Sequence, residues 1–204
     1  SKPLILLVGI SILRQSVNRT MDWNEIDWGV LERLRANFLR GGAGQEDDWQ
    51  AESDLASYDA TFAQRIGWKW DYVLDELVRR GWSPPRGELL DWGCGSGIAG
   101  RAFLDHFGVK AVTSLRVWDR SSLAMRFAEW RAKEKYPELT VNPAQSEQPA
   151  ILVLSHVLTE LPPEHFEALI NVVVTAQSVL WVEPGTFDAS RKLIVIRERL
   201  RSQL

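Results

Sequence analysis

The chain has 204 residues, and its 45% hydrophobic and 25% charged residues are the proportions of one soluble globular domain with an added segment. Its net charge of -3 excludes a generally basic protein, so a nucleic-acid-binding surface would have to be a local patch. A single cysteine excludes an internal disulfide framework and multi-cysteine zinc or iron–sulfur sites, and we therefore expect a reducing, cytoplasmic compartment.

The first predicted element is the apolar run from Leu4 to Leu13. A membrane-spanning helix needs about 20 apolar residues, and this run stops at Arg14. It also lacks the basic leader and the small-residue cleavage site of a signal peptide. We therefore expect a buried helix or strand here, and no membrane partner.

Two helical patterns follow. The first covers 22–40 and ends at a glycine-rich stretch. The polar, acidic stretch 45–54 then predicts an exposed loop. The second pattern covers 58–80, and Gly67 inside it is a candidate break between two helices. Residues 1–83 are therefore predicted to form a helical N-terminal segment.

From residue 88 onward the pattern changes to short apolar strands alternating with helices. The expected elements are strands at 89–91, 115–118, 139–141, 151–154 and 179–182 and helices at 98–107, 122–135, 163–176 and 190–204. This alternation predicts an α/β domain over residues 84–204, with a mostly parallel sheet covered by helices on both faces. Right-handed crossovers then bring the loops that follow the strands to one edge, where ligands bind.

The loop 91–97, with the sequence DWGCGSG, carries the strongest chemical signal. Glycines directly after a strand allow a tight turn and a close approach of the backbone to a ligand. The helix that follows directs its free N–H groups and the positive end of its dipole at that ligand. Asp119 closes the second strand, 22 positions after Gly97, where an acidic side chain can bind both hydroxyls of a ribose.

Two kinds of cofactor could use this loop. Gly95, Gly97 and Gly100 match the GxGxxG spacing of dinucleotide enzymes. The alternative begins with Asp91 and resembles the first motif of class I methyltransferases, an acidic residue followed by GxGxG. A carboxylate at Asp91 repels a pyrophosphate and suits the cationic ammonium and sulfonium of S-adenosylmethionine. The charge favours the second alternative, provided that the carboxylate faces the ligand.

Two later segments narrow the set of methyltransferase families that this chain resembles. The first is 155–162, SHVLTELP, and the second is 183–186, EPGT, followed by a basic helix. With the glycine loop, they resemble the methyltransferase-like family associated with the small ribosomal subunit of mitochondria and bacteria, over residues 55–204. This resemblance implies a Rossmann-like class I methyltransferase fold, S-adenosylmethionine as the cofactor and the small subunit as a partner.

The sequence also departs from that family. Its members continue into a cysteine-bearing tail that can bind an iron–sulfur cluster, whereas Cys94 is the single cysteine here. Class I folds close with an antiparallel hairpin, and we expect that hairpin to be absent. These departures leave the activity of the chain open.

The motifs and the resemblance together predict a set of site residues. We expect the cofactor to contact Asp91, Gly93, Cys94, Gly95, Gly97, Asp119, Arg120, Ser155 and His156. His156 and Glu160 are the candidate catalytic residues, although either could simply be bonded to neighbouring groups. The sequence leaves two roles open for Glu183, contact with a substrate and anchoring of a loop. No metal site is predicted.

The last helix is rich in basic residues, namely Arg191, Lys192, Arg197, Arg199 and Arg201. Such a run is usually a solvated helical face, and contact with ribosomal RNA phosphates is the alternative.

The leading hypothesis is a methyltransferase that acts on or associates with the small ribosomal subunit. A non-catalytic assembly factor is the first alternative. A small-molecule methyltransferase, with an enclosed pocket above Gly93, is the second.

Overall fold

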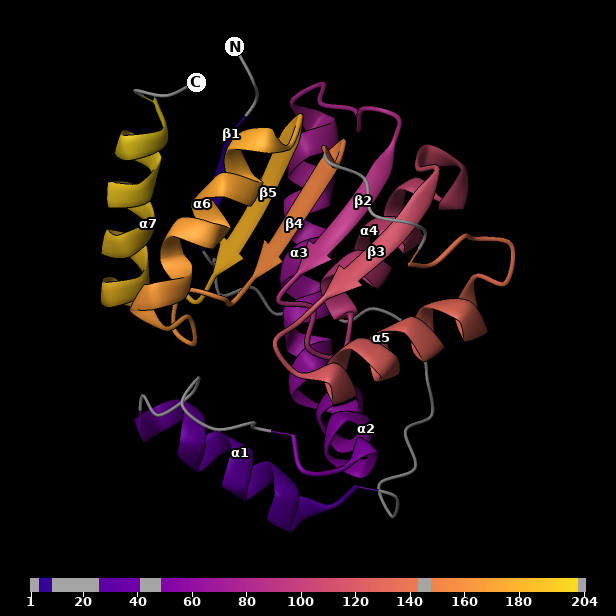
Figure 1. Cartoon of the computed structure of the whole chain (residues 1–204), viewed down its shortest axis with the longest axis vertical. Coiled ribbons are helices and arrows are strands. Elements are labelled where there is room, and N and C mark those ends of the chain that lie inside the picture. Colours follow the sequence, from indigo (N-terminus) through magenta and orange to yellow (C-terminus); the bar gives the residue numbers. More distant parts are fainter. Residues whose placement is uncertain (1–3, 9–25, 41–48, 143–147, 202–204) are drawn as a thin grey trace.

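A computed structural model of the chain describes residues 4–8, 26–40, 49–142 and 148–201. Its centre is a parallel five-stranded sheet in the order β1-β5-β4-β2-β3 (Figure 1). The strands are β1 (Leu4–Val8), β2 (Glu88–Trp92), β3 (Ser114–Trp118), β4 (Ile151–Ser155) and β5 (Ser178–Glu183). The predicted α/β class with a parallel sheet is confirmed.

Alternate residues of each inner strand enter different cores, as the two-residue period of a strand requires. On one face Leu89, Val153 and Leu180 pack against α3 (Phe62–Arg79), α4 (Ile98–Phe107) and α5 (Ser122–Lys135). On the other, Leu90 and Trp181 pack against α6 (Phe166–Thr175) and α7 (Phe187–Arg201). Helices therefore cover both faces of the sheet, as predicted.

The boundaries of most elements agree with the sequence pattern. Helices α4 and α5 have the predicted ends, and short 3-10 turns, Val109–Ala111 and Pro163–His165, precede β3 and α6. The helix α7 begins at Phe187, three residues earlier than expected. The expected strand at 139–141 is wrong, because this segment forms only an isolated bridge between Val141 and Leu115.

The segment before β2 differs more from the prediction. It contains β1, which pairs with β5 at the sheet edge, and the helices α1 (Trp28–Arg40) and α2 (Glu52–Ala60). The prediction of a loop over 45–54 is therefore wrong at its C-terminal end, because α2 begins at Glu52. The helix break occurs at Thr61 and not at Gly67, which lies inside α3. The domain boundary at 83/84 stays a prediction.

Gly67 lies inside α3 and faces α4. A Cβ atom at this position would meet the Ile98 side chain of α4 at 3.5 Å, an ordinary van der Waals distance, so the contact between the two helices does not require a glycine here. The strand arrows in Figure 1 point to the side of the sheet where α1 and α2 lie. The carboxyl ends of the strands and the N-terminal helices therefore meet on one side of the molecule. None of the helices described is both long and apolar enough to cross a membrane.

Candidate cofactor pocket at the carboxyl ends of the strands

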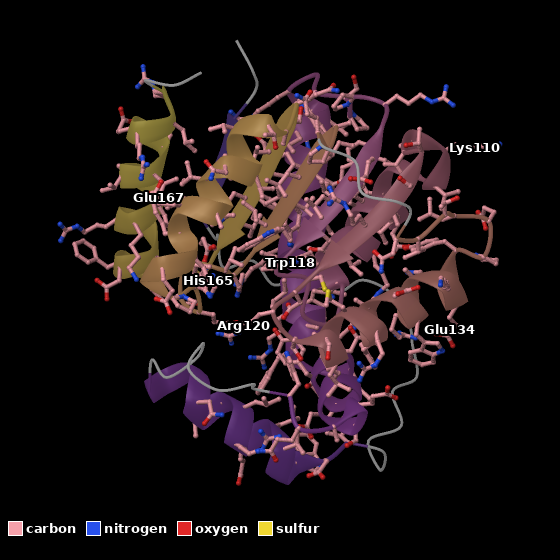
Figure 2. The ribbon with its side chains drawn as sticks, viewed as in Figure 1. Lys110, Trp118, Arg120, Glu134, His165 and Glu167 are labelled. Carbon is pink, nitrogen blue, oxygen red and sulfur yellow. The ribbon has the colours of Figure 1, made fainter. Side chains whose placement is uncertain are left out.

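A pocket of about 190 Å³ opens at the carboxyl ends of β2, β3 and β4. Its wall includes the loop 93–96, Trp118 to Ser121, and residues 155–157 after β4. Figure 2 shows Trp118 at the end of β3, Arg120 just beyond it and His165 near the start of α6, whereas Lys110 lies well away from them. Of the predicted cofactor residues, the structure brings Gly93, Cys94, Gly95, Asp119, Arg120, Ser155 and His156 to this pocket.

The glycine loop is folded by its own backbone hydrogen bonds. The N–H groups of Gly93 and Cys94 donate to the Trp118 carbonyl at 2.7 and 3.0 Å, and the Gly97 N–H donates to the Cys94 carbonyl at 2.6 Å. Gly93, Gly95 and Gly97 have φ values of 72°, 51° and 78°. Other residues rarely adopt this conformation, so the glycines are required by the turn itself.

Asp91 does not face the pocket, which corrects the prediction that its carboxylate meets a bound cation. The residue shares the strand face of Leu89, so its side chain points toward α4, where Oδ2 accepts the Gly100 N–H at 2.8 Å. The side chain is 1% exposed, and burial raises its pKa to about 7. Its Oδ1 atom has no hydrogen-bond partner among the described residues. Asp91 therefore acts as a cap inside the first turn of α4.

Asp119 is the carboxylate at the pocket. Its Oδ2 atom accepts the Gly95 N–H at 2.8 Å and its Oδ1 atom accepts the Ser121 N–H at 2.9 Å. These two bonds fix the carboxylate between the glycine loop and the start of α5, in the wall of the pocket. The spacing between Gly97 and Asp119 in the sequence therefore brings the Asp119 carboxylate into direct contact with the glycine loop.

Two tryptophans form a flat part of the pocket wall. Trp92 and Trp118 are aligned partners in β2 and β3, and their rings stack at 4.4 Å between centroids with a 20° interplanar angle. Trp118 is 40% exposed. Trp49 and Tyr58, from the segment before β2, complete an aromatic surface around the pocket. Such a surface suits a planar heterocycle, because stacking uses the faces of the rings.

A buried ion cluster connects α2 to the glycine loop, and the sequence analysis missed it. Arg101 of α4 donates from Nη1 to the Ser96 carbonyl at 2.5 Å and from Nη2 to Asp59 of α2. Arg131 of α5 pairs with the same aspartate at 3.3 Å. Both Arg101 and Asp59 are 4% exposed. A lone arginine in the apolar helix 98–107 is the signal that could have identified this cluster.

The loop after β4 is held by α3 and by Glu183. Trp70 Nε1 donates to Ser155 Oγ at 3.0 Å, and Lys69 Nζ lies 3.3 Å from His156 Nε2. His156 has a φ of 60°, and its N–H donates to the Val182 carbonyl at 2.8 Å. Glu160 lines the same pocket. Lys69 and Trp70 were not predicted, since neither follows a strand nor belongs to a motif.

Glu183 anchors a loop, which decides one question left open by the sequence. Its Oε1 atom accepts the N–H groups of Val157 and Leu158 at 3.0 and 3.1 Å and Trp181 Nε1 at 2.7 Å. The side chain is fully buried, and burial raises its pKa to about 7. The chain therefore occupies Oε1, while Oε2 has no hydrogen-bond partner among the described residues. Burial keeps this carboxylate away from a substrate.

The basic residues of α7 are largely engaged with acids. Arg197 and Arg201 pair with Glu198, and Arg199 makes two bonds of 3.0 Å to Glu167 of α6. These pairs agree with a solvated helical face. In the described ranges, no three His, Cys, Asp or Glu side chains gather as a metal site would require.

The fold and the pocket define a Rossmann-like α/β domain of the methyltransferase type, with an acidic residue before GxGxG and an acid at the end of the next strand. The profile of the family described as mitochondrial small ribosomal subunit Rsm22 matches residues 73–204, nearly two thirds of the sequence. The chain belongs to this family. No curated protein matches it.

Several solved structures are similar in outline. A Methanococcus maripaludis protein assigned as an S-adenosyl-L-methionine-dependent methyltransferase is 12% identical, with a TM-score of 0.47, and the match covers 76% of this chain and 75% of that one. The plantazolicin methyltransferase BpumL, solved with SAH, is 16% identical, with a TM-score of 0.43 and coverage of 72% and 58%. Streptomyces venezuelae DesVI is 18% identical, with a TM-score of 0.43 and coverage of 67% and 58%. The chain thus spans less than two thirds of the latter two proteins, and likenesses this weak identify neither a ligand nor a reaction.

Proposed function

We propose that this domain binds S-adenosylmethionine in the pocket beside Asp119 and serves as a methyltransferase of the small ribosomal subunit. The glycine loop supplies the main support. Dinucleotide and phosphate sites present free backbone N–H groups to the anion, but here those of Gly93, Cys94, Gly95 and Gly97 are bonded within the chain. The loop is a poor cradle for a pyrophosphate.

The first turn of α4 supports the same conclusion. Its Gly100 N–H, which would otherwise be available to a phosphate, donates to Asp91. Asp91 therefore occupies a backbone donor that a phosphate would need, whether or not its carboxyl group is charged. Asp91 thus still disfavours a dinucleotide, although by capping α4 and not by contacting the ligand.

The residues around the pocket fit the parts of the proposed cofactor. Asp119 suits the ribose hydroxyls, and the Trp92–Trp118 pair and Tyr58 suit the adenine. The narrow turn at Gly93 and Gly95 leaves space for the methionine part. When bound, S-adenosylmethionine supplies an electrophilic methyl group. The contribution of the protein is to hold an acceptor in line with that group.

Calorimetric titration tests the cofactor directly. We expect heat of binding from S-adenosylmethionine and S-adenosylhomocysteine, none from NADH, and a clear loss of affinity in Asp119→Ala. Asp75→Ala is a matched control, because this exposed α3 carboxylate makes only a 3.8 Å pairing with His106. Binding of NADH in place of both sulfur compounds would overturn the proposal.

The ribosomal part of the proposal rests on the family to which the chain belongs. Its test is a methylation assay with purified protein, labelled cofactor and small subunits from a strain that lacks the gene. Transfer of label to the subunit supports an enzyme. Co-sedimentation with the subunit without transfer supports the second candidate, a non-catalytic assembly factor, which is favoured by the burial of Glu183 and by the three donors that its Oε1 atom accepts.

The place of action is also part of the proposal. We infer a cytoplasmic protein, because a chain with one buried cysteine has no disulfide and suits a reducing compartment. Since the family description names the mitochondrial subunit, fractionation with antibody detection should compare cytoplasm and mitochondria.

The basic face of α7 is the proposed contact with ribosomal RNA. Replacing Arg191 and Lys192 with Gln should weaken binding to the subunit and reduce its salt dependence.

A further inference from the structure

His156 is held by two different elements. Its main-chain N–H is bound to β5 through Val182, and its ring is reached from α3 by Lys69, with 3.3 Å between Nζ and Nε2. The neighbouring Trp70 of α3 binds Ser155. The ring is thereby fixed in the wall of the pocket, where it lies among the lining residues.

The identity of this partner determines which nitrogen of the ring carries the proton. A lysine ammonium has three donors and no acceptor. Nε2 must therefore accept, so in the neutral ring the proton is on Nδ1. The other ionisable groups that line this pocket are Tyr58, Cys94, Asp119, Arg120, Glu160 and His165. Burial lowers the pKa of Lys69, and the charge of Glu183 counteracts this lowering. Burial and the adjacent Lys69 lower the pKa of His156 to about 3, which keeps the ring neutral.

We propose that His156 is a neutral hydrogen-bond donor to the ligand through Nδ1–H, and that Lys69 is the positioning residue that fixes this tautomer. The ring contact of His156 with the protein is made by Nε2, so Nδ1 is the nitrogen that we assign to the ligand. The ligand atom opposite it is then an acceptor, such as a carbonyl or carboxylate oxygen or an unprotonated ring nitrogen. The nature of the ligand rests on the proposed function, whereas the tautomer does not.

This assignment excludes His156 as the general base that the sequence analysis considered. The basic lone pair of the ring lies on Nε2 and is engaged by Lys69, so it is unavailable to a substrate proton at neutral pH. The pocket consequently suits a methyl acceptor that already carries a free lone pair, such as a neutral amine or a ring nitrogen. An acceptor that must first lose a proton would need another base.

Nitrogen-15 NMR of the unliganded protein tests the tautomer. The chain has three histidines, and the spectrum of His156→Gln assigns the resonances of His156. We expect the neutral Nδ1–H form throughout the range from about pH 5 to about pH 8. An Nε2–H form, or titration near the ordinary value of about 6.5, would overturn the proposal.

Substitution of Lys69 tests its role. Lys69→Met should convert His156 to the Nε2–H form or to a mixture and weaken binding of S-adenosylhomocysteine roughly tenfold, whereas Lys69→Arg, which retains donors, should keep the tautomer. Lys110→Met is the matched control, since this exposed lysine lies away from the pocket (Figure 2). An unchanged tautomer in Lys69→Met would refute the role of Lys69. The wild-type spectrum decides the tautomer even if Lys69→Met fails to fold.

The proposed hydrogen bond from His156 Nδ1–H to the ligand can be tested separately by NMR. In the wild-type protein, saturating S-adenosylhomocysteine, or a bound methyl acceptor, should shift the Nδ1–H proton resonance. If S-adenosylhomocysteine does not bind at all, the proposed function fails while the tautomer assignment stands. If both ligands bind and the resonance of His156 is unchanged, the donor role is wrong and the proposed function stands.

Discussion

Carboxylates at the ends of three strands illustrate two different uses of the same chemical group. Asp91 in β2 and Glu183 in β5 are almost completely buried, and backbone N–H groups occupy one oxygen of each. Asp119 lies one residue beyond β3 and reaches the pocket. The difference teaches that an acid within a strand is directed by the strand face into a core, whereas an acid just beyond the strand can serve a ligand.

The largest expected effect comes from removing Glu183. In Glu183→Ala, three buried donors, the N–H groups of Val157 and Leu158 and Nε1 of Trp181, lose their acceptor. At roughly 1–3 kcal/mol for each unsatisfied group, the free energy of unfolding should fall by about 4 kcal/mol. Urea denaturation measures this loss. Glu183→Gln, which keeps an oxygen acceptor, should lose far less, and equal losses in the two variants would contradict the anchoring role.

The second effect is a dependence of stability on pH. Burial raises the folded-state pKa of Asp91 from 3.8 to about 7, so the folded protein holds a proton that the unfolded chain releases. The contribution of Asp91 to the free energy of unfolding is fully present below about pH 4 and is lost as the pH rises toward 7. The wild type should therefore lose on the order of 3 kcal/mol relative to Asp91→Asn between about pH 4 and pH 8.

Paired urea denaturation curves at several pH values would measure this difference. A difference between wild type and Asp91→Asn that stays constant with pH would show that the folded-state pKa of Asp91 is ordinary.

The third effect separates binding from stability. Asp119→Ala should weaken S-adenosylmethionine binding by about 10- to 100-fold, since a hydrogen bond to a charged group contributes roughly 1.5–3 kcal/mol. Its two backbone bonds are only partly buried, so the loss of stability should be about 1 kcal/mol. Calorimetry and urea denaturation give the two values. A stability loss as large as that of Glu183→Ala would remove the distinction between the two kinds of carboxylate.

The smallest expected effect compares two glycines. Gly95 and Gly108 have φ values of 51° and 79°, and a Cβ atom would meet nothing within 4 Å at either position. Alanine at each should therefore cost only backbone strain, about 1–2 kcal/mol. Only Gly95→Ala should also weaken cofactor binding, because Gly95 lines the pocket. Equal affinities in the two variants would mean that the ligand does not approach the loop at Gly95.

Local pattern predicted the regular elements well. The 98–107 and 122–135 helices have the expected ends, and four of the five expected strands are present. The failures occur where packing overrides local preference. Gly67 is tolerated inside α3 because one glycine costs a helix only about 1 kcal/mol, and the buried face of α3 packs along its length. The 139–141 segment has the composition of a strand, but it makes only a bridge to Leu115.

The site was predicted only where its residues follow strands. Gly93, Asp119 and His156 reach the pocket because the topology brings strand ends to one edge. Lys69, Trp70 and Asp59 come from helices that are distant in sequence, and no motif marks them. The orientation of Asp91 could have been predicted from strand alternation, since it lies two residues after Leu89 and shares its face.

The sequence by itself determined the alternation of strands and helices, the turn at residues 91–97 and the acid at Asp119, because these depend on local periodicity and on the conformational freedom of glycine. Only the tertiary structure decided which carboxylates are buried, which N–H groups the glycine loop retains and which nitrogen of His156 accepts from Lys69. Those properties depend on contacts between residues far apart in the chain, and local sequence does not encode them.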